Sequence, residues 1–561
     1  MQVGNVEPYI NTNAPFGPVA SELIDDRTLW NELFDRENRA YSHLRRRDPA
    51  FVVGRRGSGK TMFLFALTTD EPTLNVTINT STAVAEIEDL LRSLDSMQIT
   101  LFADHISELW ASALWHGIFA ALVRNADGVF DEQDRRFETI KIYLDDLSSD
   151  NARTTSSEAI IGLFCGELLG QVETKRMVAR HPTLYALNGV TMNDLIGQAS
   201  ELLVEAAMTP VLLMDSIEDF QDVLDYHTRA IEGLFMQVGR SAQPSAPFRI
   251  RFSFPAELWH ELRKMSRNPL KDFGRFVVLQ WSAREIVKIA AHRFMIYLEH
   301  FQPDYLAANR DVAKLNTDNE PDALALLRTV LPVTLRGELG VEEDSIAYVL
   351  RHTQLLPRHL LRLLNAIWSR GDGFAQEGVV RVGDDAVIKG ICDIEEQIVT
   401  EICKAYELVY PAADDVCRAV IKNLPRRFSD SELHKSFNRV GKGALKRSHR
   451  RIDERRFATN ASRVGSLDQS TPDMDYFEFR SMLLEIGCIG RQVDETERYY
   501  VAEFEYAIPQ RLAVGDDDMM CVHPLFSGVY QSKEPDGDEP RRLVYPYGSD
   551  PSTDHRLQQG D

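Results

Sequence analysis

The sequence predicts an α/β protein whose core is a parallel β-sheet with helices on both faces. Five short apolar runs, each as long as one buried strand, alternate with segments of helical spacing. These runs cover residues 50–53, 74–78, 211–214, 248–254 and 276–279. A glycine-rich stretch separates the first run from an apolar helical stretch, which is the pattern of a strand, a tight loop and a helix.

At 561 residues the chain is long enough for three or four folding units. We expect an N-terminal extension over 1–48, with a helix-like stretch over 26–47, and a core over 49–282. The core contains a helical insertion at about 81–209, whose clearest helices span 101–123 and 191–207. A helical lid follows over 283–395.

The C-terminal part of the chain mixes helices and strands. Residues 396–531 begin with helices and continue through a basic and polar loop over 439–473. A helix over 475–486 and strands around 499–506 and 519–523 follow, and helices followed by a β-hairpin are the layout of a winged helix. Residues 532–561 are rich in Pro, Asp and Gly, and we predict that they form a disordered tail.

Composition limits the classes of function. Apolar residues make up 44% and charged residues 26% of the chain, which is the balance of a globular protein. With 85 acidic and 63 basic side chains the net charge is −22, so any contact with nucleic acid requires a local basic patch. The six cysteines lack the spacing of a zinc site or a disulfide framework, which favours a reducing cytoplasm. No signal peptide and no run of about 18 apolar residues is evident, so we expect no membrane contact.

The glycine-rich stretch matches the phosphate-binding pattern GxxxxGK[ST] at every fixed position, between a strand and an apolar helix. The glycines of this pattern let backbone N–H groups curl around phosphates, the lysine reaches the β- and γ-phosphates, and the hydroxyl ligates Mg²⁺. A chance glycine-rich turn is the alternative. We predict a nucleoside-triphosphate site formed by Gly54, Arg55, Arg56, Gly57, Ser58, Gly59, Lys60, Thr61 and Met62.

A phosphate loop of this kind also needs a carboxylate for magnesium at the end of a neighbouring buried strand. Asp215 follows the apolar run 211–214, and we expect it to hold Mg²⁺ together with Thr61. Ser216 stands next, where many ring-forming ATPases have a glutamate that polarises water. The catalytic role of activating water therefore falls to Glu218 or Asp219, or is weak.

Three motifs together resemble the STAND branch of the AAA+-related ATPases, a group of NACHT-type and origin-initiator-like switches. They are GRRGSGKT at 54–61, LLMDSIED at 212–219 and TQLLPRHLLRLLNAI at 353–367. The resemblance implies ATP as the nucleotide, contacted by Pro357 and sensed at its γ-phosphate by Arg358. The alternative for the third motif is a plain helix with proline in its first turn and a solvated arginine.

The same resemblance extends, more loosely, to other parts of the chain. Ser253 stands at the tip of the fourth core strand, where the family usually has an Asn or Thr that acts as a sensor. Arg267 and Arg275 precede the fifth strand, where an arginine finger commonly acts on a neighbouring subunit. The C-terminal segments are similar to those of bacterial ATPases found beside defence effectors. The resemblance thus implies a slowly hydrolysing switch in anti-phage defence that forms homo-oligomers and controls an effector or partner protein.

One segment of the chain has a net positive charge, in contrast to the negative charge of the whole chain. Residues 435–456 contain nine Lys or Arg against two acids, with Lys446, Arg447, Arg450 and Arg451 at its centre. It is either a phosphate-tracking patch for nucleic acid, a solvated charge run, or a patch for an acidic partner protein. The second hypothesis for function is therefore a DNA-binding ATPase of the origin-initiator or transposition-helper kind. A small-molecule kinase is disfavoured, because no site for an acceptor substrate is evident.

Overall fold

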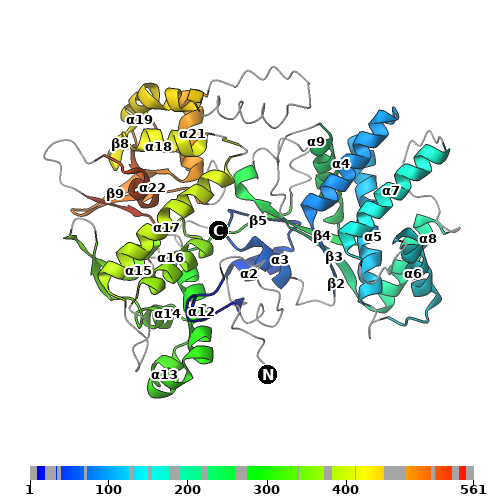
Figure 1. Ribbon diagram of the computed structural model, residues 1–561, viewed down its shortest axis with the longest axis horizontal. Coiled ribbons are helices and arrows are strands. Elements are labelled where there is room, and N and C mark those ends of the chain that lie inside the picture. Colours follow the sequence, from blue (N-terminus) through cyan, green and yellow to red (C-terminus); the bar gives the residue numbers. More distant parts are fainter. Residues whose placement is uncertain are drawn as a thin grey trace. The chain divides into compact units, whose positions relative to one another are not determined.

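The computed structural model divides into two compact units (Figure 1). The sheet unit comprises Tyr41–Val53 and Lys60–Val278, and the C-terminal unit comprises Met1–Ala40, Gly54–Gly59 and Leu279–Asp561. The chain therefore passes between units inside the predicted phosphate loop. The structure describes residues 9–18, 33–34, 39–67, 73–125, 130–148, 155–175, 190–215, 225–259, 274–337, 340–371, 382–407, 409–410, 412–447, 474–506, 512–533 and 542–550.

Five parallel strands form the core of the sheet unit, which confirms the predicted α/β class. In spatial order they are β2 (Thr73–Ile78), β3 (Thr209–Met214), β4 (Arg249–Pro255), β1 (Phe51–Gly54) and β5 (Phe276–Val278). The apolar side chains of β3 are buried, with Leu212 in register between Val76 and Ile250. Because the carboxyl ends of parallel strands meet at one edge, the residue after β3 and the end of β4 are neighbours.

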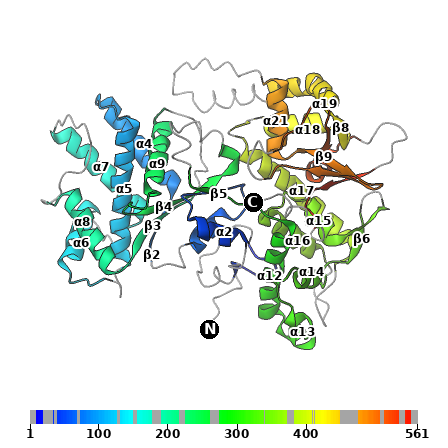
Figure 2. The ribbon, with the colours of Figure 1, turned by 180° about the vertical axis from the view of Figure 1, so that it is seen from behind.

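Helices fill the long connection between β2 and β3, at the place of the predicted insertion. They are α4 (Thr80–Ser96), α5 (Ala103–Arg124), α6 (Arg135–Ser148), α7 (Ser157–Lys175) and α8 (Met192–Glu205), and α9 (Asp225–Ser241) follows β3. α5 packs against α6, α7 and α9, and Figures 1 and 2 show α6 beside α8. In the described part of the chain α5 is the one helix with the length and apolarity of a membrane span, but 83% of its apolar window is buried in the unit.

A buried histidine on α5 gives the sheet unit a pH dependence. His116 is fully buried, its Nε2 lies 2.8 Å from Tyr143 Oη, and burial lowers its pKa from 6.5 to about 4. The folded unit therefore keeps this ring neutral, whereas the unfolded chain takes up a proton below pH 6.5. Stability from the neutral ring is present above pH 6.5 and is lost as the pH falls toward 4, up to about 3 kcal/mol.

We expect this loss to be measurable with His116→Gln, which has no titrating ring. Between pH 7.5 and 4.5 the free energy of unfolding should fall by about 2 kcal/mol more in the wild type than in the variant. Urea unfolding at the two pH values measures the difference, and all other titrating groups are common to both proteins. An equal fall in both proteins would contradict the assignment.

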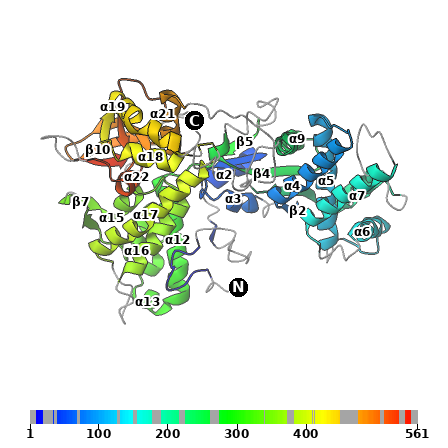
Figure 3. The same ribbon diagram turned by 45° about the horizontal axis from the view of Figure 1, so that its top comes forward.

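The helices that follow the sheet form the first half of the C-terminal unit. They are α12 (Ala283–Phe301), α13 (Pro303–Ala308), α14 (Glu320–Leu327), α15 (Ser345–Arg351), α16 (Pro357–Arg370) and α17 (Asp384–Ala405), with short 3-10 turns and a hairpin of β6 (Thr334–Arg336) and β7 (Glu342–Asp344). α16 packs against α12 and α17, as Figure 3 shows. A capping box of Ser282 and Glu285 starts α12 and fixes where the helical region begins.

An N-terminal segment is tied to these helices by hydrogen bonds. Asn365 of α16 accepts from the N–H of Phe16 at 3.1 Å and donates to the carbonyl of Gly17 at 3.1 Å. Trp368 donates to the carbonyl of Thr12 at 2.9 Å, and the buried Arg293 of α12 donates to that of Pro18 at 2.6 Å. Part of the predicted N-terminal extension is therefore an integral piece of the C-terminal unit.

A second sheet lies in the C-terminal half of this unit. Its strands, in spatial order, are β12 (Leu543–Pro546), β10 (Tyr499–Glu503), β9 (Ile489–Glu495), β11 (Met519–Val522) and β8 (Arg427–Ser429). The same half of the unit contains several helical elements. They are α18 (Ala413–Ile421), α19 (Asp430–Ser436), the π-helical turn η5 (Phe437–Gly441), α21 (Tyr476–Ile486) and α22 (Pro524–Tyr530).

The structure differs from the predicted organisation at two places, in the C-terminal tail and at residue 395. β12 pairs in parallel with β10, so a disordered tail over 532–561 is wrong for the residues that form β12. Their apolar side chains are buried against the neighbouring strand, which the polar surroundings in the sequence concealed. α17 runs without a break across 395/396, so the boundary predicted there is misplaced. This helix packs on α16 at one side and on α18 and α22 at the other, and so joins both halves of the unit.

Three of the scattered cysteines come together in this half. Cys403, Cys417 and Cys488 are buried, and their thiols interact with one another. A hydrogen bond with Cys417 and burial raise the pKa of Cys403 well above its usual range, and burial raises that of Cys488. Thiols that stay protonated are poor metal ligands and nucleophiles, so we assign the cluster to packing of the core.

Candidate functional site

The first half of the predicted phosphate loop, Gly54–Gly59, folds as a tight turn in the C-terminal unit. The N–H of Ser58 donates to the carbonyl of Arg55 at 3.1 Å, and φ is +83° at Gly57 and +87° at Gly59. Side chains are rarely tolerated at such φ values, so both positions require glycine. Successive N–H groups of a turn with positive φ make a concave site for anions.

A tryptophan and a serine shape the same turn. Trp281, just after β5, donates its indole N–H to the carbonyl of Ser58 at 2.9 Å. The hydroxyl of Ser58 is buried and finds no hydrogen-bond partner among the residues that the structure describes. Buried polar groups are almost always hydrogen-bonded, so this hydroxyl fits a place where a polar ligand enters.

The helix that carries Pro357 and Arg358 begins directly at the phosphate loop. The N–H of Arg358 donates to the carbonyl of Gly57 at 3.4 Å, and Pro357 occupies the first turn of α16, where its missing N–H costs nothing. A Cβ added to Gly57 would lie 2.8 Å from Cβ of Arg358. The structure therefore brings the third motif of the sequence to the first half of the loop.

The second half of the loop opens α3 (Lys60–Ala66) in the sheet unit. Lys60 is 8% exposed, and the hydroxyl of Thr61 donates to Oδ2 of Asp215 at 2.6 Å. Asp215 directly follows the last residue of β3, at the carboxyl edge of the sheet. The two predicted magnesium ligands are thus brought together from positions 154 residues apart in the chain.

Two further hydroxyls fix this aspartate. Ser253 of β4, fully buried, donates to its second carboxylate oxygen, Oδ1. Thr80, at the start of α4, donates to the main-chain carbonyl of Asp215. Because β4 lies between β3 and β1, Ser253 reaches the carboxylate from the neighbouring strand. The sequence predicted a polar role for Ser253 but gave no signal for Thr80.

The oxygens that the structure brings together at Asp215 suit magnesium bound to a nucleotide. In the described part of the chain no group of three or more His, Cys, Asp or Glu could hold a metal ion. Magnesium in nucleotide sites takes one or two protein oxygens and completes its shell with phosphate oxygens and water. The hydroxyl of Thr61 and the carboxylate of Asp215 are such oxygens.

The remaining residues of the loop differ in exposure. Arg56 and Met62 are partly exposed, whereas Arg55 is buried and its guanidinium group lies at the end of α21. The sequence predicted Arg55 as part of the phosphate loop and gave no signal that its side chain would reach α21.

Other candidate residues fall outside the part of the chain that the structure describes. They are Ser216, Glu218, Asp219, Arg267, Arg450 and Arg451. Arg275 is described, and it donates to the carbonyl of Ala242 at 2.5 Å and lies 3.8 Å from the carboxylate of Asp48. This arginine therefore has acceptors within its own unit.

No protein-family model matches the chain, and no curated protein does. The nucleotide assignment therefore depends on the loop motif and on the contacts around Asp215.

A buried neutral histidine lies in the first turn of α16, which is hydrogen-bonded to Gly57 of the loop. His359 of α16 accepts from the N–H of Gln354 at 3.3 Å through Nδ1. Burial lowers its pKa to about 3, with Arg358, Arg362 and Arg55 adding to the effect. This ring therefore remains an uncharged acceptor and supports the turn before α16. No sequence pattern indicated it.

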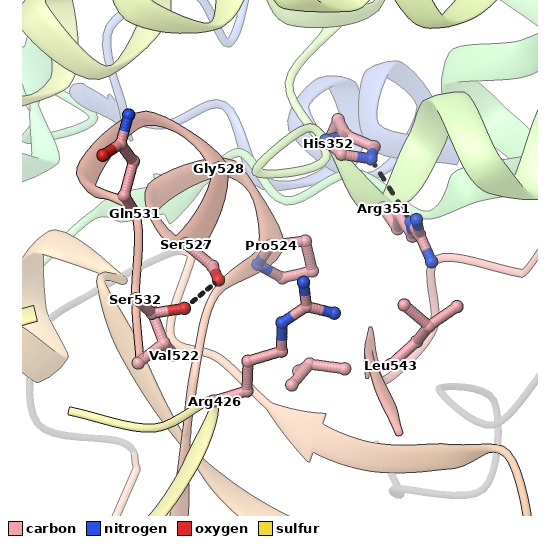
Figure 4. A pocket seen from close by; sticks show the side chains of 11 residues that line it. Arg351, His352, Arg426, Val522, Pro524, Ser527, Gly528, Gln531, Ser532 and Leu543 are labelled. Atoms are coloured by element: carbon pink, nitrogen blue, oxygen red, sulfur yellow. Dashed lines mark hydrogen bonds between the residues drawn. The ribbon is translucent and has the colours of Figure 1, made fainter. Parts of the chain in front are cut away.

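The C-terminal unit also contains a cavity of about 200 Å³ away from the loop residues (Figure 4). Arg351 and His352 from the end of α15 face Arg426, Ser527 and Ser532 across it. Arg351 is paired with the buried Glu343 at 2.8 Å, and His352 with Glu395 at 2.5 Å. Both groups on the α15 side are therefore already paired within the protein.

The described part of the basic segment lies on helices. Lys435, Arg439, Lys442, Lys446 and Arg447 are exposed between α19 and residue 447. Arg439 donates to Asn423 at 2.7 Å, and Lys442 lies over the ring of Phe437 at 5.6 Å. The exposure of these cations is compatible with each of the three readings of the segment.

Proposed function

We propose that this chain is an ATP- and Mg²⁺-dependent switch of the bacterial cytoplasm. It hydrolyses ATP slowly, and its nucleotide state controls self-assembly or a partner effector, in keeping with a role in anti-phage defence. The strongest support for this proposal is a single hydrogen bond. The threonine that ends a complete phosphate-loop motif donates to a carboxylate at the edge of a parallel sheet, at 2.6 Å.

Each residue of the motif has a role that its position supports. The N–H groups of Gly57–Gly59 and the ammonium of Lys60 bind phosphate oxygens, and Thr61 and Asp215 place Mg²⁺. Ser253 holds the carboxylate of Asp215 in orientation through its second oxygen. ATP, when bound, supplies the γ-phosphoryl group whose loss separates the two states.

Activation of water is the role of an acid shortly after Asp215. Glu218 and Asp219 are the two candidates, and either would accept a proton from the attacking water. Without a glutamate directly after Asp215, we expect turnover to be slow. A slow step suits a switch, because the ATP state then persists long enough to act.

The contacts of the lid helix α16 support a way for the protein to distinguish ATP from ADP. Its first turn is bonded to Gly57, and its apolar residues Leu360, Leu361, Leu363, Leu364 and Ile367 are buried. Such a helix moves as one body with the helices packed on it. A γ-phosphate bound by Arg358 would therefore favour one lid position, and ATP and ADP would favour different states through that differential contact.

Analytical ultracentrifugation with ATP, ADP or no nucleotide tests this switch. We expect the sedimentation coefficient of the wild type to change with ATP, and Arg358→Ala to give the same value with ATP and ADP. The matched control is Arg362→Ala, one turn along α16, where the arginine pairs with Glu401 at 2.6 Å. This control should keep the response to ATP. An identical oligomeric state in all samples would contradict a nucleotide-controlled assembly.

A further inference from the structure

The second residue of the phosphate loop is anchored in the C-terminal unit. Arg55 is 2% exposed. Its Nη1 donates to Oε1 of Gln354 at 2.8 Å and to the carbonyl of Ile486 at 3.3 Å. Its Nη2 donates to the carbonyl of Glu505 at 2.9 Å and to that of Glu485. All these partners belong to the C-terminal unit, as Arg55 itself does.

The acceptors suit a cation because two of them end a helix. Glu485 and Ile486 are the last residues of α21, and the final carbonyls of a helix lack partners within it and carry partial negative charge. Gly487 then turns the chain at φ +74°. A Cβ there would lie 2.7 Å from Gln354 Nε2 and 3.5 Å from Arg55 Nη1, so glycine permits the close approach.

Gln354 and Tyr406 complete this anchor. Gln354 is 1% exposed and donates to the carbonyl of Ile486 at 2.7 Å while it accepts from Arg55. Tyr406, at the end of α17, donates to the carbonyl of Glu485 at 2.6 Å, and the guanidinium carbon of Arg55 lies 5.7 Å from its ring centre. Gln354 also stands three residues before Pro357, the start of the lid helix.

The main chain of Arg55 shapes the turn that its side chain anchors. The carbonyl of Arg55 accepts from the N–H of Ser58 at 3.1 Å, which closes the turn over Gly57. A displacement of α21 or of the 485–487 turn would therefore pull on the backbone that presents N–H groups to phosphate. Loss of the anchor would also leave the buried guanidinium of Arg55 without its acceptors and the carbonyls at the end of α21 without their donor. Buried polar groups that lose their hydrogen-bond partners destabilise the fold.

We propose that Arg55 is a positioning residue through which the region around α21 and β10 sets the affinity of the loop for nucleotide. This proposal rests on the proposed function and assigns a regulatory contact to the same site. With the anchor made, the turn is held ready for phosphate. With the anchor broken, nucleotide binds weakly. Because such coupling is reciprocal, bound nucleotide stabilises the contact of Arg55 with α21.

The test combines Arg55→Ala and Gln354→Leu, singly and together, with hydrogen–deuterium exchange and nucleotide titration. Gln354→Leu weakens the anchor without changing the phosphate loop, because it removes one acceptor of Arg55 and the hydrogen bond from Gln354 to Ile486. The matched control is Tyr410→Phe, which removes a 2.7 Å hydrogen bond to Oε2 of the same Glu485 and no bond to Arg55. Arg55→Lys keeps the charge but not the planar fork of donors.

We expect each anchor variant to speed exchange in 476–486 without nucleotide and to weaken nucleotide binding about tenfold, within the usual range of coupling between sites. The double variant should lose little more than either single one, because the two residues act together. Tyr410→Phe should keep the wild-type affinity, and Arg55→Lys should fall between wild type and Arg55→Ala. Normal nucleotide binding in both anchor variants, or unchanged exchange in 476–486, would overturn the role of Arg55 alone. Absence of nucleotide binding by the wild type would overturn the proposed function with it.

Discussion

Lys60→Ala is expected to weaken ATP binding by about 30- to 100-fold, because it removes a charge-assisted hydrogen bond to the phosphates, which is worth about 1.5–3 kcal/mol. The side chain is nearly buried at the start of α3, and alanine is a good helix former, so the sheet unit should still fold. Polarisation of a fluorescent ATP analogue measures the affinity.

Lys60→Met is the matched control for shape, since it keeps the length of the side chain and lacks the charge. We expect it to behave like Lys60→Ala. Wild-type affinity in either variant, with an unchanged urea midpoint, would show that the lysine does not bind phosphate.

Asp215→Ala is expected to slow magnesium-dependent ATP hydrolysis by at least about a hundredfold, because a metal that offsets phosphoryl charge contributes several kcal/mol to the transition state. The substitution removes the acceptor of both Thr61 and Ser253. Phosphate release under single-turnover conditions measures the rate.

Two further substitutions distinguish the loss of the negative charge of Asp215 from the loss of its hydrogen bonds. Asp215→Asn keeps the shape and one acceptor oxygen, and it should be nearly as slow as Asp215→Ala. Ser253→Ala removes one hydrogen bond to the carboxylate and leaves that of Thr61, and it should cost about tenfold, the lower end of the effect of losing one hydrogen bond to a charged group. Wild-type turnover in Asp215→Asn would contradict a metal-binding role.

The sheet and the proximity of Thr61 to Asp215 were predictable because their signals are local. Each core strand is a short apolar run, and the carboxyl-edge rule for parallel strands places the end of β3 beside that of β4. The pairing of Thr61 with Asp215 follows from that rule and from the loop motif. The order of the strands needed the structure, since it depends on crossovers that sequence spacing does not encode.

The C-terminal unit was less predictable, because its elements depend on distant partners. β8 and β12 have three and four residues, too few for a pattern, and they are held by β11 and β10. The same holds for the site. The sequence predicted Arg55 as one residue of the phosphate loop, yet the partners of its side chain lie between 299 and 450 residues away. Hydrogen bonds to main-chain carbonyls leave no signature in the identity of the acceptor residue.

Isothermal titration of the wild-type protein with ATP, in the presence of Mg²⁺ and again with excess EDTA, tests the central claim most directly. We expect one ATP per chain with Mg²⁺ and markedly weaker binding with EDTA, since Thr61 and Asp215 would act on the nucleotide through the metal. Folded protein that gives no binding heat with ATP, ADP or GTP at millimolar concentration, and no change in thermal unfolding, would contradict it.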